Sequence, residues 1–96
     1  MSISETSPPA FDAGSPYALH RDLALRHERF GALLYHYGNR KLTFLKSPQL
    51  TAIVQDIGAH PSADAALHAH GVTAQQRPAM LRALARLQAS EVIHVR

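Results

Sequence analysis

The stretch from residue 31 to residue 46, GALLYHYGNRKLTFLK, constrains the fold most strongly, because two β-rich runs flank the pair Gly38-Asn39. Glycine and asparagine tolerate the positive φ angles of a two-residue hairpin turn, and alternating apolar residues around such a turn are typical of paired strands. The sequence therefore predicts an antiparallel hairpin. Its expected cross-strand pairs are Tyr37 with Arg40, Tyr35 with Leu42, and Leu33 with Phe44.

Alternation along these two strands also predicts which side chains share a face, since successive residues of a strand point to opposite sides of the sheet. The face assigned to the hydrophobic core carries Leu33, Tyr35, Leu42 and Phe44. The opposite face carries Leu34, His36, Lys41, Thr43 and Leu45. Aromatic residues that alternate in a strand pack well on a half-buried sheet, which favours a core position for Phe44.

A helix is predicted to begin at Ser47-Pro48, because serine suits the N-cap and proline suits the first helical position, where no backbone donor is missed. Apolar residues then recur at i, i+3, i+4 and i+7, which is typical of a helix with one buried stripe. These residues are Leu50, Ile53, Val54 and Ile57. Gly58 offers a stop after about three turns.

Two further helices are predicted in the C-terminal half, the first a short Ala-rich one between Pro61 and Gly71. Thr73 and Gln76 form a capping-box pattern, but Pro78 would remove an internal hydrogen bond of a helix that began there. A short turn followed by a longer helix from near residue 77 is therefore expected. That helix carries Met80, Leu81, Leu84 and Leu87 on one side, with Arg82 and Arg86 opposite.

The complete order is three strands followed by three helices, because residues 17–25 also alternate as a strand does. The final residues, EVIHVR, are expected to add a last short strand or a wing. Strands followed by helices indicate an α+β fold rather than parallel βαβ units. Residues 1–16 are rich in serine and proline and are expected to form a flexible tail, and residues 17–96 form one domain.

Composition excludes several kinds of site and predicts where the chain works. Cysteine is absent, so a disulfide framework, a thiolate nucleophile and an iron-sulfur cluster ligated by cysteine are excluded. No apolar run approaches the ~20 residues of a spanning helix, and the start lacks the features of a secretory signal, which predicts a cytoplasmic location. Basic residues concentrate between residues 21 and 46, a bias that would attract an acidic peptide or a nucleic acid.

The segment YHYGNRKLTFLKSP and the downstream LRALARLQASEVI resemble the PqqD-like family of peptide-recognition domains, and within it the mycofactocin precursor-peptide chaperones. The resemblance spans roughly Tyr17 to Ile93. It implies a winged-helix-like PqqD-type fold whose three-stranded antiparallel sheet accepts a ribosomally made precursor peptide as an added strand. It also implies a non-catalytic chaperone that presents this peptide to a radical-SAM maturase and needs no cofactor of its own.

The third strand of the sheet would lie at an edge, where unpaired backbone groups accept a partner strand. The candidate peptide-binding residues are Arg40, Lys41, Leu42, Thr43, Phe44, Leu45 and Lys46, with Arg82 and Arg86 on the last helix by the family resemblance. An acidic precursor peptide matches the basic bias of this half of the chain. The same exposed edge makes a homodimer plausible.

Two other functions compete with peptide binding. A winged helix could place its last helix in the major groove of DNA, with Arg77, Arg82 and Arg86 at phosphates, although the formal charge of +3 is low for this role. The histidines, notably His60, His68 and His70, suggest a metal site. Positions i and i+2 of a helix point apart, so His68 and His70 are expected to face solvent or to cap a helix, and no metal is predicted.

Overall fold

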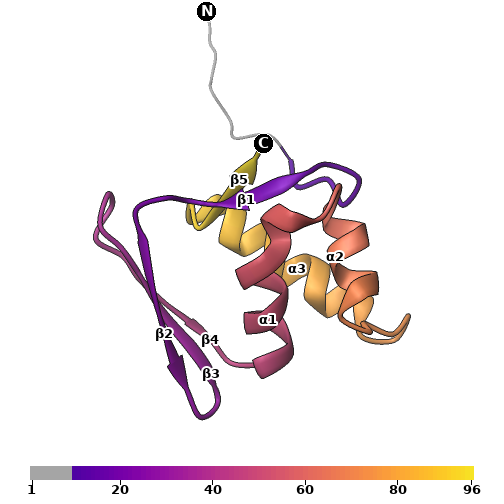
Figure 1. Cartoon of the computed structure of the whole chain (residues 1–96), viewed down its shortest axis with the longest axis horizontal. Helices are drawn as coiled ribbons and strands as arrows, with labels where there is room; N and C mark the ends of the chain where they lie inside the picture. Colours follow the sequence, from indigo (N-terminus) through magenta and orange to yellow (C-terminus); the bar gives the residue numbers. More distant parts are fainter. Residues whose placement is uncertain (1–9) are drawn as a thin grey trace, which may run out of the picture.

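A sheet and a group of helices form two layers in the computed structural model, which describes residues 10–96 (Figure 1). The elements are β1 (Tyr17–Leu19), β2 (Leu23–Glu28), β3 (Gly31–His36), β4 (Leu42–Leu45), α1 (Pro48–Asp56), the 3-10 turn η1 (Ile57–Ala59), α2 (Ala63–Ala69), α3 (Arg77–Ala89) and β5 (Ile93–Val95). A three-stranded antiparallel sheet is thus followed by three helices, which confirms the predicted α+β fold.

The strands form two separate antiparallel sheets. The larger one has the order β2-β3-β4, and the smaller one pairs β1 with β5. The extended run predicted over residues 17–25 is therefore divided at His20–Asp22, because β1 leaves to pair with the C-terminal strand. This ribbon brings the start and the end of the domain side by side above the helices (Figure 1). The predicted last strand is confirmed.

The hairpin between β3 and β4 has the predicted pairing with a different turn. Leu33 pairs with Phe44 and Tyr35 with Leu42, as the alternation predicts. The predicted two-residue turn is wrong: positive φ falls on Arg40, at 62°, and its N–H donates to the carbonyl of His36 at 2.7 Å. The loop has four residues, from Tyr37 to Arg40, and is still centred on Gly38-Asn39. The register of the two strands is therefore as predicted.

The ring of His36 explains why the longer turn is stable. Its Nδ1 accepts hydrogen bonds from the backbone N–H groups of Gly38 and Asn39, at 3.0 and 3.1 Å. The Asn39 side chain in turn accepts from the N–H of Lys41 at 3.0 Å. His36 is buried, so these bonds satisfy turn amides from inside the domain. Sequence periodicity carries no sign of this arrangement.

The predicted inward face of the hairpin is wrong. Leu34, His36 and Leu45 are buried, whereas the side of Leu42 and Phe44 faces away from the helices, with exposures of 60% and 56%. Apolar residues stand next to one another in both strands, so each face carries some of them, and alternation does not tell which face the helices cover. Here α1 and its neighbours cover the face of Leu34.

The helices begin and pack as their sequences predict. Ser47 Oγ accepts from the N–H of Leu50 at 3.1 Å, and Ser62 Oγ caps α2 in the same way. The capping box before α3 is present, with both of its bonds between Thr73 and Gln76 at 3.1 Å. The buried core includes the whole predicted stripe of the first helix, namely Leu50, Ile53, Val54 and Ile57, together with Leu84 and Leu87 of α3. Within residues 10–96, none of the helices combines the length and apolar character needed to cross a membrane.

Part of the segment predicted as a tail, residues 1–9, lies outside the described residues. Residues 10–16 lie against the domain. The ring of Phe11 stacks on that of buried Tyr17, with centroids 5.1 Å apart, and the N–H of Asp12 donates to the Tyr17 hydroxyl. The carbonyl of Ser15 accepts from the N–H of Ala63 at the start of α2. This segment therefore covers one end of the core.

Candidate functional site

Among residues 10–96, strand β4 pairs only with β3, so its other edge is free in this part of the chain. The hydrogen bond from the N–H of His36 to the carbonyl of Lys41 determines which backbone groups of β4 point towards β3 and which point towards the free edge. Hydrogen-bonded and non-hydrogen-bonded pairs alternate along an antiparallel ladder, so Thr43 and Leu45 bond to β3. The N–H and C=O groups of Leu42 and Phe44 consequently face the open edge, ready to pair with another strand.

A groove of about 200 Å³ separates this edge from α3. Its lining consists of Thr43, Phe44 and Leu45 from β4, Leu50 from α1, and Ala83, Arg86, Leu87 and Ser90 from α3 and its C-cap. The floor is apolar, since Leu45, Leu50 and Leu87 belong to the core, and Arg86 is exposed at the wall. Backbone groups on one side and an arginine on the other suit an extended chain with acidic side chains.

The turn of the hairpin is joined to the end of α3. Asn39 Nδ2 donates to the carbonyl of Ser90 at 3.2 Å and lies 3.4 Å from Glu91 Oε1. Glu91 has a positive φ of 64°, which directs the chain from α3 towards β5. These contacts hold β4 and α3 at a fixed spacing at this end of the groove.

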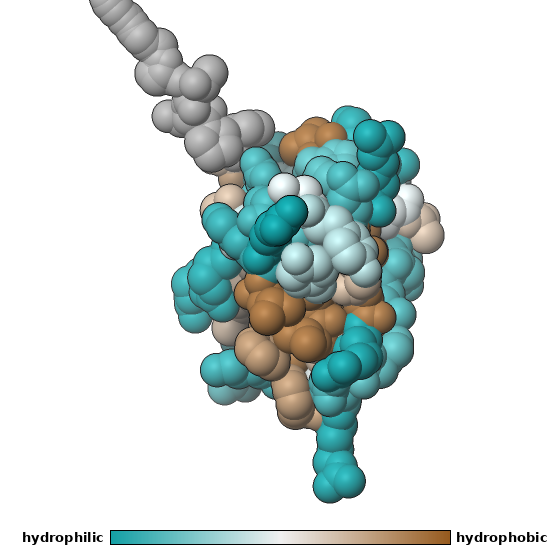
Figure 2. Space-filling view, turned by 90° about the vertical axis from the view of Figure 1, so that its left-hand side faces the viewer, coloured by the Kyte–Doolittle hydropathy of each residue, from teal (hydrophilic) through white to brown (hydrophobic). Residues whose placement is uncertain are grey.

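The outer face of the sheet is a second exposed surface, next to the same edge. It carries tyrosines together with hydrophobic side chains, and the hydrophobic ones form the brown area facing the viewer in Figure 2. Phe30 and Phe44 lie with ring centroids 6.2 Å apart, and Tyr35 and Tyr37 with centroids 5.0 Å apart. An exposed apolar surface beside an open strand edge is unusual for a protein without partners. Side chains of a chain added to β4 would extend this surface.

The predicted site residues divide into three groups. Thr43, Phe44, Leu45 and Arg86 lie at the groove. Arg40 and Lys41 belong to the turn, Leu42 lies on the outer face with its backbone at the edge, and Lys46 follows the strand. Arg82 is exposed on α3 but does not line the groove. Part of the predicted strand and one of the two predicted arginines thus line the groove, and their role in peptide binding stays a prediction.

Four residues that line the groove are not among the site residues predicted from the sequence, namely Leu50, Ala83, Leu87 and Ser90. Ala83 and Ser90 could have been found from Arg86, because residues at i−3 and i+4 lie near one another on a helical surface, and Leu87 lies four residues after Ala83. Leu50 could not, since its place in the groove depends on how α1 packs beside β4. A larger hollow, of about 800 Å³, lies along the β1–β5 ribbon and shares no residue with the groove.

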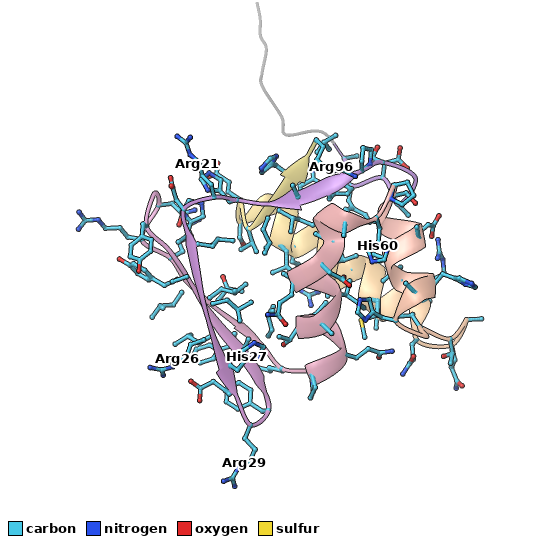
Figure 3. The ribbon with its side chains drawn as sticks, viewed as in Figure 1. Arg21, Arg26, His27, Arg29, His60 and Arg96 are labelled. Atoms are coloured by element: carbon cyan, nitrogen blue, oxygen red, sulfur yellow. The ribbon has the colours of Figure 1, made fainter. Side chains whose placement is uncertain are left out.

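Arg26, Arg29 and Arg77 do not line the groove. Figure 3 shows Arg26 and Arg29 projecting from the β2–β3 end of the sheet. Arg26 Nε forms an ion pair with Glu28 at 2.7 Å. Arg77, one of the three residues considered for phosphate contacts, forms an ion pair with Asp64 of α2. The last helix therefore presents Arg82 and Arg86 as its exposed arginines.

The histidines do not form the pair His68 and His70. His68 is exposed, whereas His70 is part-buried at the C-cap of α2 and contacts Asp56 of α1. Burial raises the pKa of Asp56, but the contacts with His70 and His60 outweigh it and hold that pKa below its ordinary value. Side chains from two helices thus converge away from the β4–α3 groove.

Comparison with known proteins gives one consistent family. Residues 16–94 match the Peptide chaperone MftB family. A Peptide chaperone MftB from Mycolicibacterium smegmatis is 41% identical over 97% of this chain and 91% of its own. The proteins of the same name from Mycobacterium ulcerans and Mycobacterium tuberculosis are 42% and 40% identical, over 88% and 86% of this chain and 77% and 76% of their own.

No solved structure matches the chain. The family match nevertheless includes every strand and helix from β1 to α3, and with them both walls of the groove. Identity near 41% over nearly the whole chain is sufficient to assign a family. The chain belongs to the Peptide chaperone MftB family.

Proposed function

We propose that this chain is a peptide chaperone without catalysis of its own, which binds the precursor (leader) peptide of mycofactocin biosynthesis as an added strand on β4. The observation that carries the proposal is the open edge of β4 facing α3 across a groove. Family membership supports a peptide as the ligand, because the relatives are named peptide chaperones. The groove supports an extended conformation for that peptide.

Backbone pairing would supply the affinity. Leu42 and Phe44 each offer an outward N–H and C=O, and a bound strand pairs with these groups at the usual spacing of about 4.8 Å. Alternate side chains of the peptide would then point to opposite sides. One set lies over Leu45 and Leu87 in the groove, and the other set continues the outer face beside Phe44.

Charge would supply selectivity for an acidic peptide. Arg86 stands at the groove wall, and Lys41 and Lys46 are exposed at the two ends of β4. A guanidinium pairs with a carboxylate through two parallel hydrogen bonds, which fixes the position of the peptide as well as attracting it. The exposed lysines contribute mainly to the rate of encounter.

The proposed partner of the complex is a radical-SAM maturase, to which the chaperone presents the bound peptide. This partner follows from the family resemblance. The chain contains no cysteine, so the iron-sulfur cluster of such a reaction is brought by the maturase. The outer face of the sheet, with Tyr37, Leu42 and Phe44 exposed, remains available beside a peptide bound at the edge.

Titration of isotope-labelled protein with the acidic precursor peptide tests the proposal. Backbone amide shifts are expected to concentrate in residues 40–46 and in the part of α3 from Ala83 to Ser90. A peptide whose Asp and Glu residues are replaced by Asn and Gln is the matched control and is expected to bind more weakly. Shifts confined to other elements would contradict the site. Binding of duplex DNA with a steep salt dependence, without binding of the peptide, would contradict the function.

A further inference from the structure

Three potential metal ligands meet between α1 and α2. Asp56 is the last residue of α1, His60 is the C-cap of η1, and His70 is the C-cap of α2. Asp56 and His60 are four residues apart, and His70 reaches them from the neighbouring helix. One donor atom from each residue lies within 4.8 Å of the other two. The side chain of His60 is labelled in Figure 3.

The distances approach those of a metal site. His70 Nε2 lies 2.8 and 2.9 Å from the two carboxylate oxygens of Asp56, and His60 Nε2 lies 3.4 Å from Oδ2. Ligand atoms around a tetrahedral zinc ion, with bonds near 2.0–2.1 Å, are about 3.3 Å from one another. Small side-chain rotations would therefore place all three donors around one ion.

Hydrogen bonds to Asp56 are made by His70 but not by His60. The Nε2 atom of His60 is buried and lies 3.4 Å from Asp56 Oδ2, within ion-pair distance, but makes no hydrogen bond among the described residues. A buried polar atom without a partner costs free energy. Coordination of a metal ion would use the lone pair of this nitrogen and bring it into the same cluster.

We propose that Asp56, His60 and His70 bind a divalent transition-metal ion, with Zn²⁺ as the best fit. Two imidazole nitrogens and one carboxylate oxygen suit zinc, whereas Mg²⁺ and Ca²⁺ favour sites made of oxygen ligands. The Asp56 side chain is 44% exposed, which leaves a route of entry and a coordination position for water. The ion would join the C-terminal end of α1 to that of α2.

Zinc titration of the full chain, freed of any histidine tag and of bound metal, tests this site. Calorimetry is expected to show one ion per chain, and Co²⁺ is expected to give the visible absorption of a site with nitrogen and oxygen ligands. Substitution of a residue that hydrogen-bonds to a metal ligand typically lowers metal affinity about 10- to 100-fold. Loss of a ligand itself, in His60→Gln or His70→Gln, should lower the zinc affinity at least as much. His68→Gln, at the exposed histidine of α2, is the matched control and should bind normally.

Thermal unfolding provides a second readout, since an ion that binds only the folded chain raises the melting temperature with its concentration. This rise is expected in the original chain and in His68→Gln, and is expected to vanish in His60→Gln. Asp56→Asn serves as a further variant if a histidine variant fails to fold. Equal zinc affinity in His70→Gln or Asp56→Asn, or zinc-dependent amide shifts centred on His20 and His36, would overturn the proposal.

Discussion

At the scale of single residues, exposure separates the side chains that hold the fold from those available to a partner. Leu34 and Leu42 are both leucines of the same hairpin, yet one is almost completely buried and the other is 60% exposed. Their environments could not be predicted from the sequence, because alternation gives the two faces of a sheet without saying which face the helices cover. The wrong inward assignment of Leu42 and Phe44 has this cause.

Alanine substitution distinguishes the two faces. Leu34→Ala is expected to lower the free energy of unfolding by about 2–5 kcal/mol, because it leaves a cavity in the core. Leu42→Ala removes a solvent-facing side chain and should change it by no more than about 0.5 kcal/mol. Urea unfolding of both variants measures the difference. Equal destabilisation of the two would mean that the outer face is covered in the free protein.

At the scale of the elements, the sequence predicts the start of a helix well where a single capping residue precedes it. Ser47 and Ser62 cap α1 and α2, and the Thr73–Gln76 pair closes the expected turn before α3, because such bonds depend only on neighbours in the chain. The turn of the hairpin could not be predicted in the same way. Its positive φ lies on Arg40 rather than at Gly38-Asn39, since the buried ring of His36 accepts the turn amides.

The open edge of β4 leads to a prediction that separates folding from binding. Phe44→Pro removes an N–H that faces away from β3, so the hairpin should persist, as prolines are tolerated on edge strands. Peptide affinity is expected to fall about 5- to 150-fold, which corresponds to about 1–3 kcal/mol for a carbonyl of the peptide left without its donor. Fluorescence titration with labelled peptide measures the loss.

Phe44→Ala is the control, because it removes the same ring and keeps the N–H. Thr43→Pro is a second comparison: Thr43 bonds to Leu34 across the ladder, so this substitution should destabilise the hairpin itself. If Phe44→Pro binds the peptide as well as Phe44→Ala does, pairing at this edge is contradicted.

At the scale of the whole molecule, the groove exists because elements distant in the sequence are held together. Asn39 in the hairpin contacts Ser90 at the end of α3, across 51 residues of chain. The strand of the candidate site was predictable from its turn and periodicity, and Arg86 from the family resemblance. Leu50 was not, because only tertiary packing brings α1 to the groove. Whether two copies pair through the free edge stays a prediction.

The placement of charge around the groove predicts a position-specific effect on peptide binding. Arg86→Glu should weaken binding of the acidic peptide more than tenfold, because it replaces attraction by repulsion at the groove wall. Arg29→Glu makes the same change of charge in the β2–β3 turn, outside the groove lining, and should have a smaller effect. Titrations at low and at 0.15 M salt, where screening acts over about 8 Å, measure both. Equal effects would indicate nonspecific attraction.

Amide hydrogen exchange with and without the acidic peptide tests strand addition most directly. The N–H groups of Leu42 and Phe44 face the open edge of β4, so the bound peptide should slow their exchange strongly. The amides of Leu23 and Leu25, which face away from β3 on the opposite edge, should exchange as before. Protection at β2 instead, or unchanged exchange at Leu42 and Phe44 in a saturated complex, would contradict binding at β4.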